Sequence, residues 1–515
     1  MLRKLEPRTS TRFSSPKVIH DSIWGTSTFE PWEVCLLEHG VFQRLRGLKQ
    51  TGLAHLTYPT AEHSRFQHTL GVVEAAGRIF DALLKRTERG SLSPTARRFR
   101  ETHFLFKSKP KESTVRRWRM LLRLAALVHD TGHSVFSHSS ERIFSLVPPL
   151  DDLATDLAPP DHMKEPGAAE IIVYLMVTSK GWHSMVARRW PRGGRGIPRP
   201  PSESEWEMIG RWVMGQENKP ERQWLADIIS GPLDADKLDY VFRDGYAAGV
   251  PVGYDLARLI ATVCVDVQHS PECIPWWRLT IPVRGINALE QLVMGRLVLN
   301  SYLYHHQKCR AAEMAFERTL ARRFLRDGTI LGKQSVWDLF TLQDANAYTY
   351  AYENSDSSDS TAIELRAIFA RQLRVRVVEF HPPEIDRRNA GVVAGLQRLA
   401  SYRRIKDWSQ YRELLTVEDR IAEAAKLEEG AIVLDVPRNP AYADLQNIKL
   451  PQGRRLPGAD PAKILAYRDW IEVYKTHRIT YRVFGPRGHE RAIWEAAKRV
   501  FLEEFSIELP PSAKR

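Results

Sequence analysis

Apolar residues spaced three and four apart dominate the first two-thirds of this 515-residue chain. The segment 32–50 has apolar side chains at 34, 37, 41, 42, 45 and 48, which predicts an amphipathic helix that ends near Gly52. Each such helix must bury one face against other helices, so the spacing predicts a mainly α fold. The same spacing predicts four further helices, over 66–85, 116–130, 223–248 and 286–326.

The pattern changes from about residue 374, where short runs rich in Val, Ile and aromatic residues replace the helical spacing. Such runs are typical of strands. The predicted strands lie in 375–380, 431–435 and 478–484, and an amphipathic helix is predicted over 489–505.

Two domains follow from this change. We predict a helical core over 1–330 and a smaller α+β lobe over 331–515 with a regulatory or oligomerising role. Segment 86–118 is rich in Lys and Arg and has few aliphatic residues, and segment 190–203 is rich in Gly, Pro and Arg. Both compositions predict surface loops inserted between helices. The polar segment 353–360 is expected to interrupt two helices.

The composition favours a large folded protein with an anionic partner. The formal net charge is +13 and 43% of the residues are apolar, enough to bury at least one large core. A positive surface attracts nucleotides, nucleic acid or acidic membranes, although a solvated basic surface explains the charge equally well. Four cysteines without a CxxC pair indicate a reducing compartment. Because no apolar run suits a signal peptide or a membrane helix, we expect a cytoplasmic protein without a membrane partner.

The strongest chemical signal is the stretch 127–138, which reads LVHDTGHSVFSH. It follows an apolar helix, so His129 and Asp130 are expected at a buried helix end. An ionised Asp is costly to bury unless a positive charge compensates it, and a divalent cation is the simplest compensation. His133 would share a face with His129 if the helix continued, but Gly132 favours a break about equally. A lone His-Asp pair is more often a hydrogen-bonded pair than a metal site.

Two residues elsewhere in the chain strengthen the metal prediction. His68 stands at the start of another apolar helix, and Asp236 at the start of a third. The combined set of imidazoles and carboxylates suits Mn, Fe, Mg or Zn. Such an ion activates water and neutralises phosphoryl charge, so phosphoester or phosphoanhydride hydrolysis is the natural chemistry. The predicted metal ligands are His68, His129, Asp130 and Asp236.

Three long motifs resemble the HD-domain phosphohydrolase superfamily, and most closely its dNTP triphosphohydrolase branch. They are RFQHTLG at 65–71, HDTGHSVFSH at 129–138 and DKLDYVFRD at 236–244, and the segments 19–25 and 42–52 also fit that branch. The branch includes the SAM-and-HD-domain protein and bacterial dGTPases. The resemblance implies an all-helical HD core that cleaves a dNTP to a deoxynucleoside and triphosphate.

The resemblance also implies roles for individual residues. His133 and Glu141 match the family's histidine and acidic residue beside the scissile bond, and His162 stands where the family usually has a His-Glu pair. We expect His133, oriented by Glu141, to protonate the leaving 5′ oxygen while water attacks the α-phosphorus. The expected substrate contacts are Gln50 at the sugar, Arg65, Lys237, Tyr240 and Asp244 at the phosphates, and Tyr304 beside the sugar and base.

The sequence therefore predicts a metal-dependent dNTP triphosphohydrolase. Activation by a second dNTP, a homo-oligomeric state and a role in antiviral defence against phage are further expectations. Two alternatives stay open. One is an HD-type nuclease or cyclic-nucleotide phosphodiesterase, because the arginine-rich segment 86–118 suits a phosphate backbone. The other is a catalytically silent nucleotide sensor or nucleic-acid binder, against which the four-ligand set argues.

Overall fold

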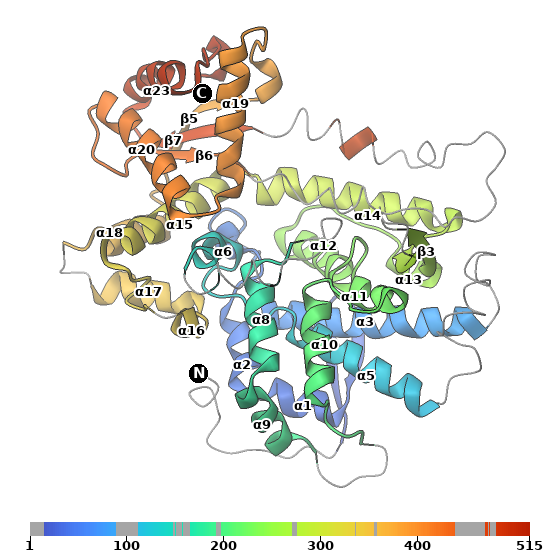
Figure 1. Cartoon of the computed structure of the whole chain (residues 1–515). Coiled ribbons are helices and arrows are strands. Elements are labelled where there is room, and N and C mark those ends of the chain that lie inside the picture. The colour runs from blue at the N-terminus through green and yellow to red at the C-terminus, as the bar shows by residue number, and fades with distance from the viewer. Residues whose placement is uncertain are drawn as a thin grey trace, which may run out of the picture.

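Helices dominate the computed structural model, and three small antiparallel sheets accompany them. The predicted mainly α fold with a smaller α+β lobe is confirmed. Figure 1 shows the orange-to-red C-terminal segments gathered at one end of the molecule, next to α15. None of the helices in the described ranges is long and apolar enough to cross a membrane. The structure describes residues 15–88, 112–147, 150, 157, 165–191, 197–269, 275–334, 336–354, 358–437, 469–471, 473 and 480–515.

The helical core is organised around α3, the helix Arg65–Glu88, against which α5 (Glu112–Val128) and α12 (Ala235–Ala248) pack. All three place predicted site residues at or next to a helix end. The remaining helices of this part are α1 (Pro31–Leu37), α2 (Gly40–Gln43), α6 (His138–Ser145), α8 (Ala168–Thr178), α9 (Lys180–Arg189), α10 (Glu203–Val213), α11 (Gln223–Ser230), α13 (Leu256–Thr262), α14 (Ile286–Leu299) and α15 (Gln307–Asp327).

Three of the predicted helices are interrupted. The helix predicted over 32–50 is divided at His39, whose Nδ1 caps α2 by accepting from the Val41 N–H. The helix predicted over 223–248 breaks at the Gly-Pro pair between α11 and α12, where proline removes a helical hydrogen bond. Between α14 and α15 the chain forms a single π-helical turn, Asn300–Tyr304. Turns of this kind are rare and are often found at functional sites.

The three predicted C-terminal strands are confirmed, and they pair antiparallel in the order β5-β7-β6. Two hairpins, β1 with β2 and β3 with β4, were not predicted. The strands are β1 (Lys17–Asp21), β2 (Gly25–Phe29), β3 (Cys264–His269), β4 (Pro275–Thr280), β5 (Val375–Phe380), β6 (Val433–Asp435) and β7 (Tyr481–Gly485). The C-terminal helices are α16 (Val336–Leu339), α17 (Asp344–Glu353), α18 (Ser360–Phe369), α19 (Ala390–Ser401), α20 (Trp408–Ala424) and α23 (Glu490–Phe505).

A buried polar network joins α15 to the C-terminal lobe. The Arg318 guanidinium donates to Glu418 Oε1 at 2.8 Å and to the Leu434 carbonyl at 3.0 Å. Its neighbour Glu317 accepts from Tyr411 Oη at 2.8 Å and from Arg142 of α6 at 3.1 Å. The domain boundary near residue 330 stays a prediction, because these contacts tie both sides of it together.

The predicted loop 86–118 lies mostly outside the described residues, as does His162. The part that is described belongs to helices. Arg116 and Arg117 of this part, together with Arg119, are paired with carboxylates, which accounts for the charge of these three residues without an anionic partner. The pairs are Arg116 with Glu112, Arg117 with Glu205 at 2.5 Å, and Arg119 with Asp81 at 2.9 Å.

Candidate active site

The four predicted metal ligands converge where α3, α5 and α12 meet. His68 Nε2 lies 2.9 Å from Asp236 Oδ1 and 3.8 Å from Asp130 Oδ2. His129 also points into this site, and one ligand atom from each of His68, His129 and Asp236 lies within 4.8 Å of the others. A cation with ligands at about 2.1 Å holds adjacent ligand atoms about 3 Å apart, so this spacing fits a metal.

The two histidines use Nδ1 for a hydrogen bond away from the site and turn Nε2 toward it. His68 Nδ1 donates to Asp239 Oδ2 at 2.7 Å, and His129 Nδ1 donates to the Ala126 carbonyl at 2.7 Å. Each ring therefore carries its hydrogen on the outer nitrogen when neutral. His129 Nε2 and Asp130 Oδ2 are buried without a hydrogen-bond partner, whereas His68 Nε2 lies within hydrogen-bond distance of Asp236 Oδ1. Although burial opposes the charge, Asp236 and Asp239 raise the pKa of His68 to about 10. A shared cation would replace that proton and satisfy the two buried acceptors, which are costly to leave without partners.

Asp239, which the sequence reasoning did not single out, holds His68 in place. Its buried carboxylate also accepts from Trp24 Nε1 at 2.6 Å and from Arg243 at 2.7 and 2.8 Å. Burial opposes ionisation, yet Arg243 holds the pKa of Asp239 at about 2. Carboxylates behind a histidine ligand fix its ring and increase its basicity. The signal for it in the sequence is its place three residues after Asp236, on the same helix face.

Arg65 lies at the metal site itself. Its Nη1 is 2.6 Å from Asp130 Oδ1, and its Nε donates to Ser137 Oγ at 2.7 Å. Although burial opposes the charge, Arg65 holds the pKa of Asp130 well below its ordinary value. Asp130 is therefore an anion, with Oδ1 on Arg65 and 3.4 Å from His129 Nε2, and with Oδ2 3.8 Å from His68 Nε2.

Glu141 orients His138, a residue to which the sequence analysis gave no role. Glu141 Oε2 lies 2.7 Å from His138 Nδ1, and the rings of His138 and His133 are in edge contact at 4.9 Å. Burial, followed by the charge of Arg65, lowers the pKa of His133 well below its ordinary value. The expectation that Glu141 orients His133 stays a prediction: His133, His138 and Glu141 each offer a ligand atom within 4.8 Å of the others, and Glu141 is hydrogen-bonded to His138.

Gln50 and Tyr304, predicted at the sugar, lie near Asp244, which was predicted at the phosphates, in a second polar group. Asp244 lies between His63, with Nε2 at 2.7 Å, and Tyr304, whose hydroxyl donates to it at 2.5 Å. Tyr304 ends the π-helical turn. Gln50 Oε1 is buried without a hydrogen-bond partner and so offers an acceptor to a ligand. His63 was missed because a single histidine in a loop carries no periodic signal.

Two predicted phosphate contacts are placed differently. Lys237 Nζ donates to the Gly231 carbonyl at 2.8 Å and to Asp234 Oδ2 at 2.5 Å, so it is turned toward the loop before α12. The Tyr240 ring lies under the Arg296 guanidinium at 6.0 Å. Arg296, from α14, is thus a cation near this group that the sequence analysis did not name.

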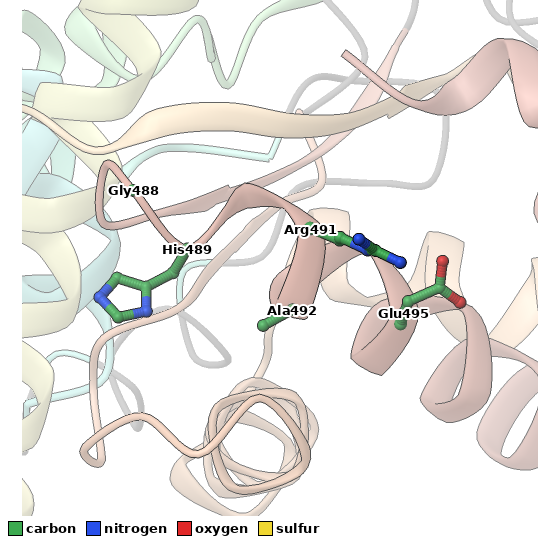
Figure 2. Close-up of a pocket in the computed structure, with 5 residues that line it drawn as sticks. All are labelled: Gly488, His489, Arg491, Ala492 and Glu495. Atoms are coloured by element: carbon green, nitrogen blue, oxygen red, sulfur yellow. The ribbon is translucent and has the colours of Figure 1, made fainter.

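A surface pocket at the start of α23 is separate from these residues. Figure 2 shows the His489 ring pointing to one side of the helix and Arg491 and Glu495 to the other. The lining side chains do not converge on a common point, so this pocket does not resemble the candidate active site.

Comparison with known proteins agrees with the HD assignment. A family model described as "HD associated region" matches residues 255–454. The chain is 28% identical over 327 residues to the deoxynucleoside triphosphate triphosphohydrolase SAMHD1 homolog of Dictyostelium discoideum, covering 62% of this chain and 51% of that protein. It is 27% identical over 259 residues to SAMHD1 of Danio rerio, covering 48% and 36%. The resemblance to the HD-domain dNTP triphosphohydrolase family is confirmed.

Other relatives show how far this likeness extends. The uncharacterized protein YwfO of Bacillus subtilis is 27% identical over 358 residues, 67% of each chain. A hypothetical protein from Aquifex aeolicus, known from a crystal structure, shares the fold with a TM-score of 0.57 and 20% identity, over 94% of this chain and 99% of that one. The chain spans 51% of the Dictyostelium protein and 36% of the Danio rerio protein. The comparisons therefore support likeness to HD-family phosphohydrolases in general.

Proposed function

We propose that this HD protein is a metal-dependent dNTP triphosphohydrolase that releases a deoxynucleoside and triphosphate. The observation that carries the proposal is the convergence of the Nε2 atoms of His68 and His129 on Asp130 and Asp236. The neighbouring His138–Glu141 pair supplies a proton donor. The printed names of the SAMHD1 relatives support this substrate class.

The four ligands suit a divalent Mn, Mg, Fe or Zn ion, which when bound would polarise a phosphoryl oxygen and lower the pKa of water. The chain's own residues then position the reacting groups. Arg65 Nη2 lies 3.4 Å from His138 Nε2, so a phosphoryl oxygen on Arg65 would lie beside this imidazole. His138, with Nδ1 held by Glu141, would give its Nε2 proton to the leaving 5′ oxygen, and Glu141 would stabilise the imidazolium.

The sugar would lie at the second polar group. Asp244 and the unpaired Gln50 Oε1 are acceptors for a 3′-hydroxyl, and Tyr304 offers a ring surface beside them. His133, Lys237 and Tyr240 remain proposed contributors to the triphosphate side, with His133 as a neutral hydrogen-bonding group. His162 remains a proposal outside the described residues.

A cluster of cations supports activation by a second nucleotide. Burial and the charges of Arg487, Arg371 and Arg376 lower the pKa of Lys308, which begins α15 next to the C-terminal lobe. Mutually repelling cations of this kind are stabilised by a bound polyanion. The homo-oligomeric state and the role in phage defence stay proposals that rest on the family resemblance, and the cytoplasmic location stays a proposal that rests on the amino-acid sequence.

The test is product analysis. The purified protein is incubated with each dNTP, alone and mixed, under Mg or Mn, and products are separated by ion-exchange chromatography. Deoxynucleoside with triphosphate is expected. Mononucleotides from a DNA strand or a cyclic nucleotide would favour the nuclease or phosphodiesterase alternative, and binding without products would favour the silent sensor. The carboxylate partners of Arg116, Arg117 and Arg119 weaken the nucleic-acid alternatives.

A further inference from the structure

Asp344, the first residue of α17, joins two segments that carry site residues. Its Oδ1 accepts from the Phe136 N–H at 2.7 Å, and its Oδ2 accepts from the Lys49 N–H at 2.8 Å. Lys49 precedes Gln50, and Phe136 lies two residues before His138. The carboxylate is buried, with 4% of the residue exposed, although it touches none of the metal ligands.

The turn that Asp344 holds is conformationally strained. Phe136 has φ 49° and Ser137 has φ 53°, which places two consecutive residues with side chains in the left-handed region. Residues other than glycine avoid this region because Cβ crowds the backbone. Helix α6 begins directly afterwards, at His138. The direction of the His138 side chain is therefore set by a turn that persists only where its surroundings fix it.

Further contacts fix the same turn from the side of α17 and α18. The Phe136 ring lies 6.1 Å from the Tyr348 ring and 6.0 Å from the Phe369 ring, and these two stack on each other at 3.8 Å. Ser137 Oγ donates to the Lys49 carbonyl at 2.9 Å. The Phe136 ring, the Phe136 N–H and the Ser137 hydroxyl each have a partner, so several independent contacts fix the conformation of the turn.

Arg44 links the loop before Phe136 to the segment before Asp344. Its buried Nη2 donates to the Thr131 and His133 carbonyls, both at 2.6 Å, and its Nη1 donates to the Leu342 carbonyl at 3.2 Å. The segment that leads into Asp344 is thereby joined to the loop that leads into Phe136. The loop 131–136 is therefore connected to residues 342–344 at both of its ends, through Arg44 at Thr131 and through Asp344 at Phe136.

We propose that Asp344 is a positioning residue, which aims His138 at the substrate by holding the Phe136–Ser137 turn in its left-handed conformation. The inference rests on the proposed function, because it concerns the proton donor of that reaction. It extends the functional unit beyond the HD motifs, to a side chain more than two hundred residues away along the chain.

Asp344→Asn tests the role with the smallest change of shape. Two backbone N–H groups require two acceptor oxygens, and an amide offers only one, so one hydrogen bond is lost. We expect unchanged metal content, a kcat for dNTP hydrolysis reduced about 10- to 100-fold and a nearly unchanged KM, since a small misplacement of a reacting group has that effect. Glu353→Gln, exposed at the other end of α17, is the matched control and should match the wild type.

A second substrate separates positioning of the acid from general damage. In p-nitrophenyl triphosphate, nitrophenolate takes the place of the deoxynucleoside 5′ oxygen and leaves the α-phosphorus without needing a proton. Asp344→Asn should therefore hydrolyse this ester at close to the wild-type rate while losing dNTP hydrolysis. Equal losses on both substrates would overturn the proposal.

A third measurement does not depend on activity. Amide hydrogen exchange of the metal-loaded protein should become faster over 131–138 in Asp344→Asn and stay unchanged in Glu353→Gln. Unchanged exchange over this loop would also overturn the inference. If the wild type cleaves no dNTP, the proposed function fails, while the exchange measurement still decides whether Asp344 holds the turn.

Discussion

Glu141 and His138 form a hydrogen-bonded pair, with Oε2 and Nδ1 2.7 Å apart, whereas His133 lies behind them with its Nε2 3.5 Å from Asp130. The two histidines therefore have different surroundings. His138 has a carboxylate to stabilise its charged form and a largely exposed side chain. His133 is buried next to Arg65 and the metal ligands.

This difference predicts unequal effects of substitution. His138→Asn should keep the metal and lose on the order of 10²–10⁴-fold in kcat, the usual contribution of a general acid. His133→Asn should lose less, because the neutral ring only supports the site. Steady-state kinetics and metal analysis of both variants check this. A larger loss in His133→Asn would favour the sequence-based assignment of the acid.

The metal prediction concerns His129 and Asp130. Replacing either residue by Ala should abolish metal content and hydrolysis together, since each contributes an unpaired buried acceptor to the site. Plasma mass spectrometry of the purified variants measures the metal. His20→Ala, exposed on β1, is the control and should retain both properties. Full activity without metal in either site variant would refute the ligand set.

Asp239→Asn should weaken metal binding without removing a ligand. Loss of the charge behind His68 is expected to raise the metal Kd about 10- to 100-fold. Competition with a chelator measures that Kd. Excess metal should restore the activity of Asp239→Asn but not that of Asp236→Ala, and failure of this rescue would make Asp239 a structural residue only.

Glu313 predicts a pH dependence of stability. It is partly buried on α15 with Oε2 3.0 Å from Arg310 Nη1, and desolvation raises its pKa to about 7 from 4.5. The folded protein then binds a proton more tightly than the unfolded chain between these values. This group therefore makes the fold more stable as the pH falls from 8 to 5, by roughly 1–3 kcal/mol.

The comparison with Glu313→Gln isolates this effect, because glutamine stays neutral throughout. The free energy of unfolding in urea, wild type minus variant, should rise by that amount between pH 8 and pH 5. A difference that does not change with pH would show that Glu313 titrates normally.

The metal ligands could be predicted from the sequence because each lies in a local motif at a helix end. The C-terminal strands could be predicted because their branched and aromatic residues are contiguous. Asp344 could not, since its contact with Phe136 spans more than two hundred residues and depends on how α17 packs. The spacing of Glu141 three residues after His138 was present in the sequence, but the direction of that pair toward the site could not be predicted, because it depends on the positive φ at Ser137.

The shared network around Arg318 and Glu317 has a consequence for dissecting the protein. A fragment that ended near residue 330 would keep both charges on α15 and lose Glu418 and Tyr411, leaving buried ionic groups half-compensated, which is strongly destabilising. The HD core and the C-terminal lobe are therefore expected to melt together in a single calorimetric transition. A helical core without the lobe would need uncharged polar residues in place of Arg318 and Glu317 before it could be purified as a stable fragment.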